Sequence, residues 1–258
     1  MSRPVALVTG ASAGIGYEFA LQLAARGYDL ILVARRRERL DELAARVRSE
    51  HGVERADVIV ADLSDQGAAA VVADEVAQRN LAVDLLVNNA GFGTHGRFEK
   101  LAADRERDEI NVNVGNLVAL THAFLPGMLE RGAGGVINVA STASFQPVPY
   151  MAVYGATKAF VCSFSEALHE EVRRRGVRVI ALCPGPTATE FFGTGHVLEP
   201  KAPIRTVRDV VLTGLQAYDA STPVAIDGLF NKLLVFFSRT MPRKSVLAIA
   251  ARIMGPND

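Results

Sequence analysis

A serine, a tyrosine and a lysine, three residue types that can take part in catalysis, lie close together between residues 138 and 160, in the stretch NVASTASFQPVPYMAVYGATKAF. Tyr154 and Lys158 are four residues apart, so on a helix they share one face, one turn from each other. A phenol has a pKa of about 10 and is a poor acid at neutral pH, but a fixed ammonium close by favours the phenolate and lowers that pKa. The pair then suits general acid or base chemistry, although the same spacing also occurs by chance on helices.

Ser141 lies upstream of this pair, directly after an apolar, strand-like run. A hydroxyl at that place can hydrogen-bond the oxygen of a reacting carbonyl or alcohol. The three side chains together indicate chemistry at a carbon–oxygen bond, provided that the fold brings them to one place.

Short apolar runs alternate with longer helical patterns along the whole chain. The predicted strands are rich in Val, Ile and Leu with little polar alternation, which is typical of parallel strands covered on both faces; they are Val5–Val8, Leu30–Ala34, Asp57–Ala61, Leu85–Asn88, Gly135–Ala140, Arg178–Cys183 and Pro223–Ile226. Helices are predicted at Gly14–Arg26, Glu38–Glu50, Ser64–Gln78 and Met151–Arg175, with Gly27, Gly52 and Gly176 as left-handed caps. Repeated strand–helix units predict an α/β fold with a doubly wound parallel sheet.

A glycine-rich turn joins the first predicted strand to the first predicted helix. Glycines permit a tight turn and close approach of the backbone to a ligand, and the following helix N-terminus attracts a pyrophosphate. This context predicts a dinucleotide site rather than a plain tight turn, with the residues Gly10, Ser12, Ala13, Gly14, Ile15 and Gly16.

The end of the second predicted strand indicates which dinucleotide is bound. An NAD site usually carries an acid there for the ribose diol, whereas this chain has Ala34 and then Arg35 and Arg36. A guanidinium suits a 2′-phosphate by charge and by bidentate geometry. We therefore favour NADP(H), with Arg35 as first phosphate ligand and Arg36 behind it, and keep NAD(H) and a solvated basic helix start as alternatives.

Two further strand ends carry polar residues that suit a cofactor. Asp62 and Leu63 offer a carboxylate and a backbone amide to an adenine edge, although Asp62 serves equally well as a turn or cap residue. After the fourth predicted strand, the amides of Asn88 and Asn89 can tie strands together, while Ala90 and Gly91 let a cofactor ribose lie close.

These motifs together resemble the short-chain dehydrogenase/reductase family in its single-domain form. The matching pieces are TGASAGIG at 9–16, Asp62, NNAG at 88–91, Asn113, Ser141, Tyr154-x-x-x-Lys158 and Pro184-Gly185, in the order and spacing of the family. The resemblance covers residues 5 to about 190 and implies a Rossmann-type sheet of seven parallel strands with helices on both faces, in three layers. It also implies homo-oligomers, dimers or tetramers, formed through the helices that hold Asn113 and Tyr154.

The resemblance assigns roles to individual residues. Tyr154 would be the proton donor or acceptor, Lys158 would lower its pKa and bind the nicotinamide ribose, and Ser141 would orient the substrate oxygen. Asn113 would hold a water that links the lysine to solvent. Pro184, Gly185, Thr187 and Thr189 would lie at the nicotinamide amide and the pyrophosphate, and the implied reaction is hydride transfer between nicotinamide and a carbonyl or secondary alcohol.

Substrate choice is expected in the segments around this frame. The candidates are mostly apolar, which predicts an apolar carbonyl substrate: Phe145 and Gln146 after Ser141, and Phe191 and Phe192 in a substrate loop at about 184–206. Residues 228–255 form a predicted C-terminal helical extension of two short amphipathic helices broken before Pro242. Five basic residues in it indicate a lid, a subunit contact, a peripheral membrane contact or ordinary core helices with a solvated face.

The composition sets limits on the remaining alternatives. The 258 residues, 49% hydrophobic with zero formal net charge, predict one soluble domain over 1–258 and no nucleic-acid partner. We find no signal peptide, no apolar run of membrane-spanning length and no metal-ligand spacing, and the buried character of Cys162 and Cys183 indicates a reduced, cytoplasmic setting. A cofactor-sensing protein without chemistry is the main rival, against which the intact Asn113, Ser141, Tyr154 and Lys158 argue.

Overall fold

The computed structural model describes residues 3–189 and 204–255. Within them, seven strands form one sheet in the order β3-β2-β1-β4-β5-β6-β7, and every neighbouring pair is parallel. The strands are β1 (Val5–Thr9), β2 (Asp29–Ala34), β3 (Ala56–Val60), β4 (Leu85–Asn88), β5 (Gly135–Val139), β6 (Arg178–Cys183) and β7 (Val224–Ile226). The predicted Rossmann-type sheet is thus confirmed, and the order reverses between β1 and β4.

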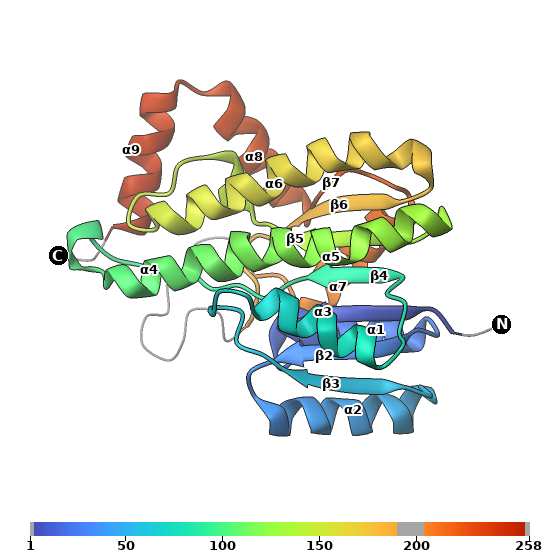
Figure 1. The fold of residues 1–258 in the computed structure, drawn as a ribbon. Helices are drawn as coiled ribbons and strands as arrows, with labels where there is room; N and C mark the ends of the chain where they lie inside the picture. The colour runs from blue at the N-terminus through green and yellow to red at the C-terminus, as the bar shows by residue number, and fades with distance from the viewer. Residues whose placement is uncertain (1–2, 190–203, 256–258) are drawn as a thin grey trace.

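Helices cover both faces of the sheet and make three layers. One core cluster joins the sheet to α1 (Gly14–Ala25), α2 (Arg37–His51) and α7 (Val207–Asp219). Clusters on the other face join it to α3 (Ala68–Gln78), α5 (Asn116–Arg131) and α6 (Ala152–Val172). The long helices α5 and α6 lie side by side over the sheet (Figure 1). Strands buried on both faces explain the nearly continuous runs of Val, Ile and Leu.

The predicted strand and helix ends agree closely with the structure, except at the start of α3. The sequence predicts this helix from Ser64, but it begins at Ala68. The Asp62 carboxylate accepts hydrogen bonds from the Ser64 backbone at 3.0 Å and the Ser64 hydroxyl at 2.7 Å, which holds a turn. Gly67, in the left-handed region with φ 85°, then precedes the first helical residue.

The helical segment Ala103–Arg131 is longer and more apolar than the sequence predicts. α4 (Ala103–Ile110) continues through a π-helical turn, η2 (Asn111–Gly115), into α5, so the helix runs unbroken from Ala103 to Arg131. This segment is long and apolar enough to cross a membrane by length and composition alone, which the sequence analysis does not predict. Its buried polar side chains hydrogen-bond within the fold, although only 33% of its apolar window is buried.

Short 3₁₀ helices and a C-terminal hairpin complete the chain. The 3₁₀ helices are η1 (Phe98–Lys100), η3 (Thr142–Phe145) and η4 (Arg173–Arg175). After β7, α8 (Leu229–Thr240) and α9 (Arg243–Met254) confirm the two predicted amphipathic helices separated at Pro242. Figure 1 shows this hairpin standing out from the sheet beyond α6.

Candidate active site

In the glycine turn between β1 and α1, the backbone of Gly10 packs closely against Gly16 and against the segment after β4. Gly10 and Gly14 adopt left-handed φ angles of 65° and 58°, which favour glycine. A Cβ on Gly10 would lie 2.7 Å from Nδ2 of Asn89, and one on Gly16 would collide with the Gly10 carbonyl. The turn therefore requires glycine at these positions for its own packing.

Asn89 joins this turn to β4 at the point where the strand order reverses. Its backbone N–H donates to the Thr9 hydroxyl at 2.9 Å, and its side-chain amide donates to the Thr9 carbonyl at 2.8 Å. The Ala90 N–H also donates to the Thr9 hydroxyl, at 3.0 Å. In doubly wound sheets ligands bind in the crevice at this switch point, and here its two walls are hydrogen-bonded together.

The N-terminus of α1 suits a pyrophosphate. Its N-cap residue is Ala13, in extended conformation, which has no side chain able to cap the first-turn amides. These amides and the positive end of the helix dipole together form an anion site. The residues present thus fit the predicted dinucleotide at its phosphates.

Arg35 and Arg36 have different partners, and only Arg36 contacts the glycine turn. Arg36 donates from Nε and Nη2 to the Ser12 hydroxyl, at 3.3 and 3.1 Å. Arg35 lies 3.5 Å from the Asp62 carboxylate with its side chain 65% exposed. Burial would raise the pKa of Asp62, but hydrogen bonds from Ser64 and the Arg35 charge lower it below its ordinary value. The sequence ranks Arg35 first for a 2′-phosphate, whereas the geometry brings Arg36 onto the turn itself.

Ser141, Tyr154 and Lys158 meet at the end of β5. Ser141 caps η3, where its hydroxyl accepts the Ala143 N–H at 3.1 Å, and it also hydrogen-bonds Tyr154. Lys158 Nζ lies 5.9 Å from the centre of the Tyr154 ring and donates to the Val139 carbonyl at 2.8 Å. The structure therefore brings together the three side chains that the spacing predicts.

The pKa values of this pair differ from the sequence expectation. Burial raises the pKa of Tyr154 to about 12, although the hydrogen bond from Ser141 acts to lower it. Burial also lowers the pKa of Lys158 to about 8. The sequence predicts a lowered pKa for Tyr154, whereas in this chain by itself the net pKa lies above its ordinary value, with loss of hydration as the largest cause. At neutral pH Tyr154 is a phenol and Lys158 is mainly charged.

Asn113 holds the backbone beside this pair. It lies in the π-helical turn η2, where its side chain accepts from the Phe92 N–H at 3.2 Å and donates to the Phe92 carbonyl at 2.9 Å. It donates as well to the Thr157 hydroxyl at 3.0 Å, and Thr157 in turn donates to the Tyr154 carbonyl at 2.8 Å. The Asn113 side chain therefore links the segment after β4 to the first turn of α6.

Gly91 fits between these groups because it has no side chain. A Cβ there would lie 2.8 Å from Asn113 Oδ1 and 3.4 Å from Lys158 Nζ. The predicted cofactor residue thus faces both predicted catalytic residues, with room only for hydrogen at its Cα.

Glu109 is a buried acid near the pair, and it is not among the residues predicted from the sequence. One of its oxygens accepts from the Thr94 N–H and hydroxyl, both at 2.8 Å, while the other is buried without a partner in the described residues. Burial raises its pKa, and its charge acts to raise the pKa of both Tyr154 and Lys158. The available signal is its position four residues before Asn113, on the same helix face.

A buried line of polar side chains ties the two central strands to the two long helices. Asn88 donates to Thr121 at 3.1 Å and to Asn138 at 2.9 Å, and Asn138 donates to Ser165 at 2.9 Å. The predicted role of Asn88 in tying strands together is confirmed. Because buried amides are costly when unpaired, this line fixes how β4 and β5 lie against α5 and α6.

Asn116, three residues after Asn113, holds backbone groups of the turn before α3 and makes no contact with Tyr154 or Lys158 among its hydrogen bonds. Asn116 donates to the carbonyls of Leu63 and Asp65, at 2.7 and 3.1 Å, and accepts the Ala69 N–H at 2.9 Å. Leu63, predicted to offer its backbone to adenine, is itself buried. These contacts hold the turn before α3 against α5.

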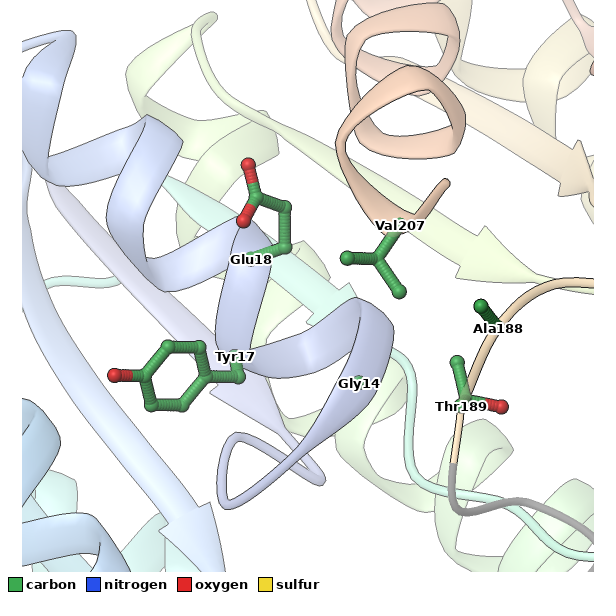
Figure 2. A pocket seen from close by; sticks show the side chains of 6 residues that line it. All are labelled: Gly14, Tyr17, Glu18, Ala188, Thr189 and Val207. Carbon is green, nitrogen blue, oxygen red and sulfur yellow. The ribbon is translucent and has the colours of Figure 1, made fainter. Parts of the chain in front are cut away.

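The segment after β6 lies across from the start of α1. Thr187 donates to the Gly185 carbonyl at 2.9 Å, and a Cβ on Gly14 would lie 3.2 Å from the Thr189 methyl. A cavity of about 550 Å³ opens here, with Ala188, Thr189 and Val207 facing Gly14, Tyr17 and Glu18 of α1 (Figure 2). The cavity adjoins the predicted pyrophosphate site and does not include the Tyr154–Lys158 pair.

The predicted substrate segments are only partly described. Phe145 and Gln146 follow Ser141 as expected and are half-buried, with the Arg239 guanidinium of α8 5.9 Å from the Phe145 ring centre. Phe191 and Phe192 lie outside the described residues. The C-terminal hairpin thus reaches the first of the two segments.

In the described part of the chain, the two cysteines form no disulfide and no metal site is found. Cys162 and Cys183 are free, buried and hydrogen-bonded to each other. Among the described residues, no group of three or more His, Cys, Asp or Glu side chains could hold a metal ion.

Comparisons with known proteins give a consistent result. The sequence profile of the short chain dehydrogenases matches residues 4–195. Hydroxysteroid dehydrogenase-like protein 1 of Gallus gallus is 37% identical over 199 residues, which span 76% of this chain and only 60% of that protein. Sulfoacetaldehyde reductase 2 of Chromohalobacter salexigens is 36% identical over 92% of this chain and 89% of its own. A solved short-chain dehydrogenase from Sphingobium yanoikuyae in complex with NADPH superposes with a TM-score of 0.82 at 35% identity, covering 95% of each chain.

Proposed function

The chain belongs to the short-chain dehydrogenase/reductase family, and from that premise we propose that it is an NADP(H)-dependent oxidoreductase that reduces a carbonyl group to an alcohol. The observation that carries this proposal is the meeting of Ser141, Tyr154 and Lys158 at the end of β5. A reduced nicotinamide cofactor, whose phosphates the glycine turn and the N-terminus of α1 would hold, would supply the hydride for the carbonyl carbon.

Tyr154 supplies the proton in this scheme. With its pKa raised to about 12, its hydroxyl is protonated at neutral pH and can pass that proton to the carbonyl oxygen as it becomes an alkoxide. This protonation state favours reduction, since the reverse reaction needs the phenolate as base. Ser141 adds a donor to the same oxygen and so stabilises the developing charge.

Lys158 places a positive charge beside the tyrosine. Its pKa of about 8 keeps most of it protonated at neutral pH, which stabilises the phenolate left after proton transfer. Asn113 acts through position, because it holds the Phe92 backbone on one side and Thr157 on the other.

The preference for NADP(H) rests on the two arginines at the end of β2. Arg36 donates to Ser12 of the glycine turn and Arg35 lies beside Asp62, and a 2′-phosphate bound between them would receive two guanidinium groups. The relative from Sphingobium yanoikuyae, which binds NADPH, supports this preference. Replacing Arg35 and Arg36 together with Ala should raise the KM for NADPH by about 10- to 100-fold, the range for charged hydrogen bonds, and leave the KM for NADH nearly unchanged.

The substrate we propose is an apolar carbonyl compound. The support is the half-buried Phe145, which follows Ser141 and the 3₁₀ turn η3 that it caps, together with Gly93, whose Cα lies against the Tyr154 ring. We also propose a cytoplasmic location and a homo-oligomer formed through α5 and α6. The support for the oligomer is the apolar segment from Ala103 to Arg131, of whose most apolar window only 33% is buried within one chain.

The decisive experiment follows NADPH absorbance over a panel of ketones, with NADH in parallel. Tyr154→Phe should abolish turnover and retain NADPH binding, measured by the fluorescence of the bound nucleotide. Tyr218→Phe is the matched control, because burial raises the pKa of that tyrosine to about 12 as well, far from Ser141. Full activity in Tyr154→Phe would overturn the assignment, and tight NADPH binding without hydride transfer to any substrate would favour a sensor.

A further inference from the structure

The C-terminal hairpin carries an unusual share of the exposed apolar surface. Of the seventeen large hydrophobic side chains exposed in the described residues, ten lie between Leu229 and Ile253. Leu229 is 74% exposed, Phe236 61% and Phe237 55%. We call the exposed apolar and basic side chains of residues 229–253 the tail surface. Contiguous apolar surface of this kind marks an interaction site.

The apolar and basic side chains of α8 are arranged in separate strips. At about 100° per residue, Leu229, Leu233, Phe236 and Phe237 fall within one arc of about 100°. Val235 lies on the opposite, buried side. Such an arrangement differs from a core helix, whose apolar strip faces the protein.

Cations border the apolar strip. Lys232 and Arg239 fall between this arc and the buried side of α8. Arg243 and Lys244 begin α9 directly after the break at Pro242. Long basic side chains at the edge of an apolar strip can extend to lipid headgroups while the apolar groups enter the interface.

The charge of the tail differs from that of the rest of the chain. Residues 228–255 contain five basic residues and no acid, whereas residues 1–227 contain 23 Lys and Arg against 27 Asp and Glu. A symmetric dimer through the tail surface would bring two such cationic surfaces together, because an isologous contact uses the same surface twice. An anionic lipid surface neutralises the same charges, so the charge favours lipid over a second copy.

The hairpin also contacts three segments that adjoin the predicted catalytic and cofactor residues. The Met254 carbonyl lies 2.8 Å from Nε2 of His95, in the segment that follows Gly93. The Arg239 guanidinium lies over Phe145, and Asn231 packs against Gly185. A surface that binds the hairpin therefore lies close to the chain segments that follow Gly93, Ser141 and β6.

We propose that the tail surface binds an anionic lipid bilayer, with Phe236 and Phe237 in the interfacial region and the bordering cations at the headgroups. Its further consequence, that a lipid-dissolved carbonyl compound reaches the site from the membrane, rests on the proposed function. Binding itself does not rest on that function.

Vesicle flotation of the full chain tests the binding. The chain should float with phosphatidylcholine vesicles that contain phosphatidylglycerol, much less with pure phosphatidylcholine, and less at high salt. Arg243→Gln with Lys244→Gln should weaken binding about 25-fold, since each cation near an anionic surface contributes about a factor of five. Phe236→Ser with Phe237→Ser should also release the chain.

Exposed apolar residues on other elements provide the control. Val71→Ser with Phe98→Ser removes side chains that are 56% and 65% exposed on α3 and η1, and should leave flotation unchanged. Equal flotation of the tail variants and the wild type would refute the proposal, as would no flotation of the wild type. Loss of a dimer in Phe236→Ser with Phe237→Ser, seen by light scattering, would assign the tail surface to a second copy instead.

The same variants separate this proposal from the proposed function. Flotation without hydride transfer to any ketone would leave the membrane contact standing and refute the reductase. Ketone reduction without flotation would support the reductase and refute the membrane contact.

Discussion

Lys158→Met should make the cofactor-free protein more stable while it removes activity. The wild-type ammonium is almost fully buried, and burial lowers its pKa from the ordinary value of 10.5 to about 8. Between these two pH values the unfolded chain binds a proton that the folded chain does not, so wild-type stability rises with pH across this window. Below about pH 8 Lys158 is charged in the folded chain, and the cost of burying that charge lowers the free energy of unfolding by its maximum value.

That amount follows from the two pKa values. At about 1.36 kcal/mol per pH unit, the difference between 10.5 and about 8 corresponds to about 3 kcal/mol at neutral pH. Methionine has a similar length and no charge, so it removes this penalty. It also loses the hydrogen bond to the Val139 carbonyl, which costs about 1 kcal/mol. The expected net gain at pH 7 is therefore about 2 kcal/mol.

Urea denaturation of both proteins between pH 7 and pH 10 measures this difference. The advantage of Lys158→Met should shrink as pH rises through about 8 and be absent near pH 10, where the wild-type side chain is neutral in the fold and largely still charged when unfolded. Lys100→Met, at an exposed lysine, should show no such pH dependence. A Lys158→Met protein that is less stable than wild type at pH 7, with a gap that does not change with pH, would refute the argument.

Three further predictions concern neighbours of the pair. In wild type, kcat/KM should fall as pH rises through about 8, where Lys158 loses its charge. Glu109→Gln should move this fall to lower pH by up to about one unit, because the carboxylate charge helps Lys158 to keep its proton. A pH profile of kcat/KM that is the same in Glu109→Gln and wild type would contradict this role. Gly93→Ala places a Cβ 2.9 Å from Cδ2 of Tyr154 and should lower kcat by about tenfold or more with NADPH affinity retained, as steady-state kinetics and nucleotide titration would show. Asn138→Leu should lower the free energy of unfolding by about 2 kcal/mol in urea denaturation, since it leaves the partners of a fully buried amide unpaired, and wild-type stability in that variant would argue against the polar line as a fold determinant.

The strands and the catalytic spacing could be predicted because both depend on local patterns. Runs of Val, Ile and Leu buried on two faces differ from helical periodicity, so the predicted strand ends lie within about one residue of those observed. Tyr154 and Lys158 share a helix face by spacing alone, and the parallel order brings Ser141 to them.

Other features depend on tertiary surroundings that a spacing does not report. The raised Tyr154 pKa comes mainly from burial by neighbouring elements, and the lowering effect in this chain is the hydrogen bond from Ser141. The contact of Arg36 with Ser12 depends on how α2 and the glycine turn lie against each other, and α3 starts late because Asp62 holds a turn. Glu109 reads in sequence as an ordinary solvated helix residue, and only the fold shows that it is fully buried.

The attachment of the hairpin has an evolutionary consequence. The proton-transfer groups are held by β5, α6 and the helix of Asn113, whereas α8 and α9 join the sheet after its last strand through Gly228, which adopts φ 78°. Replacement or elongation of the hairpin would thus leave the reacting groups in place and alter the tail surface alone. The proposed membrane contact and the proton-transfer groups thus lie on separate parts of this chain, so the one can change in a lineage without moving the other.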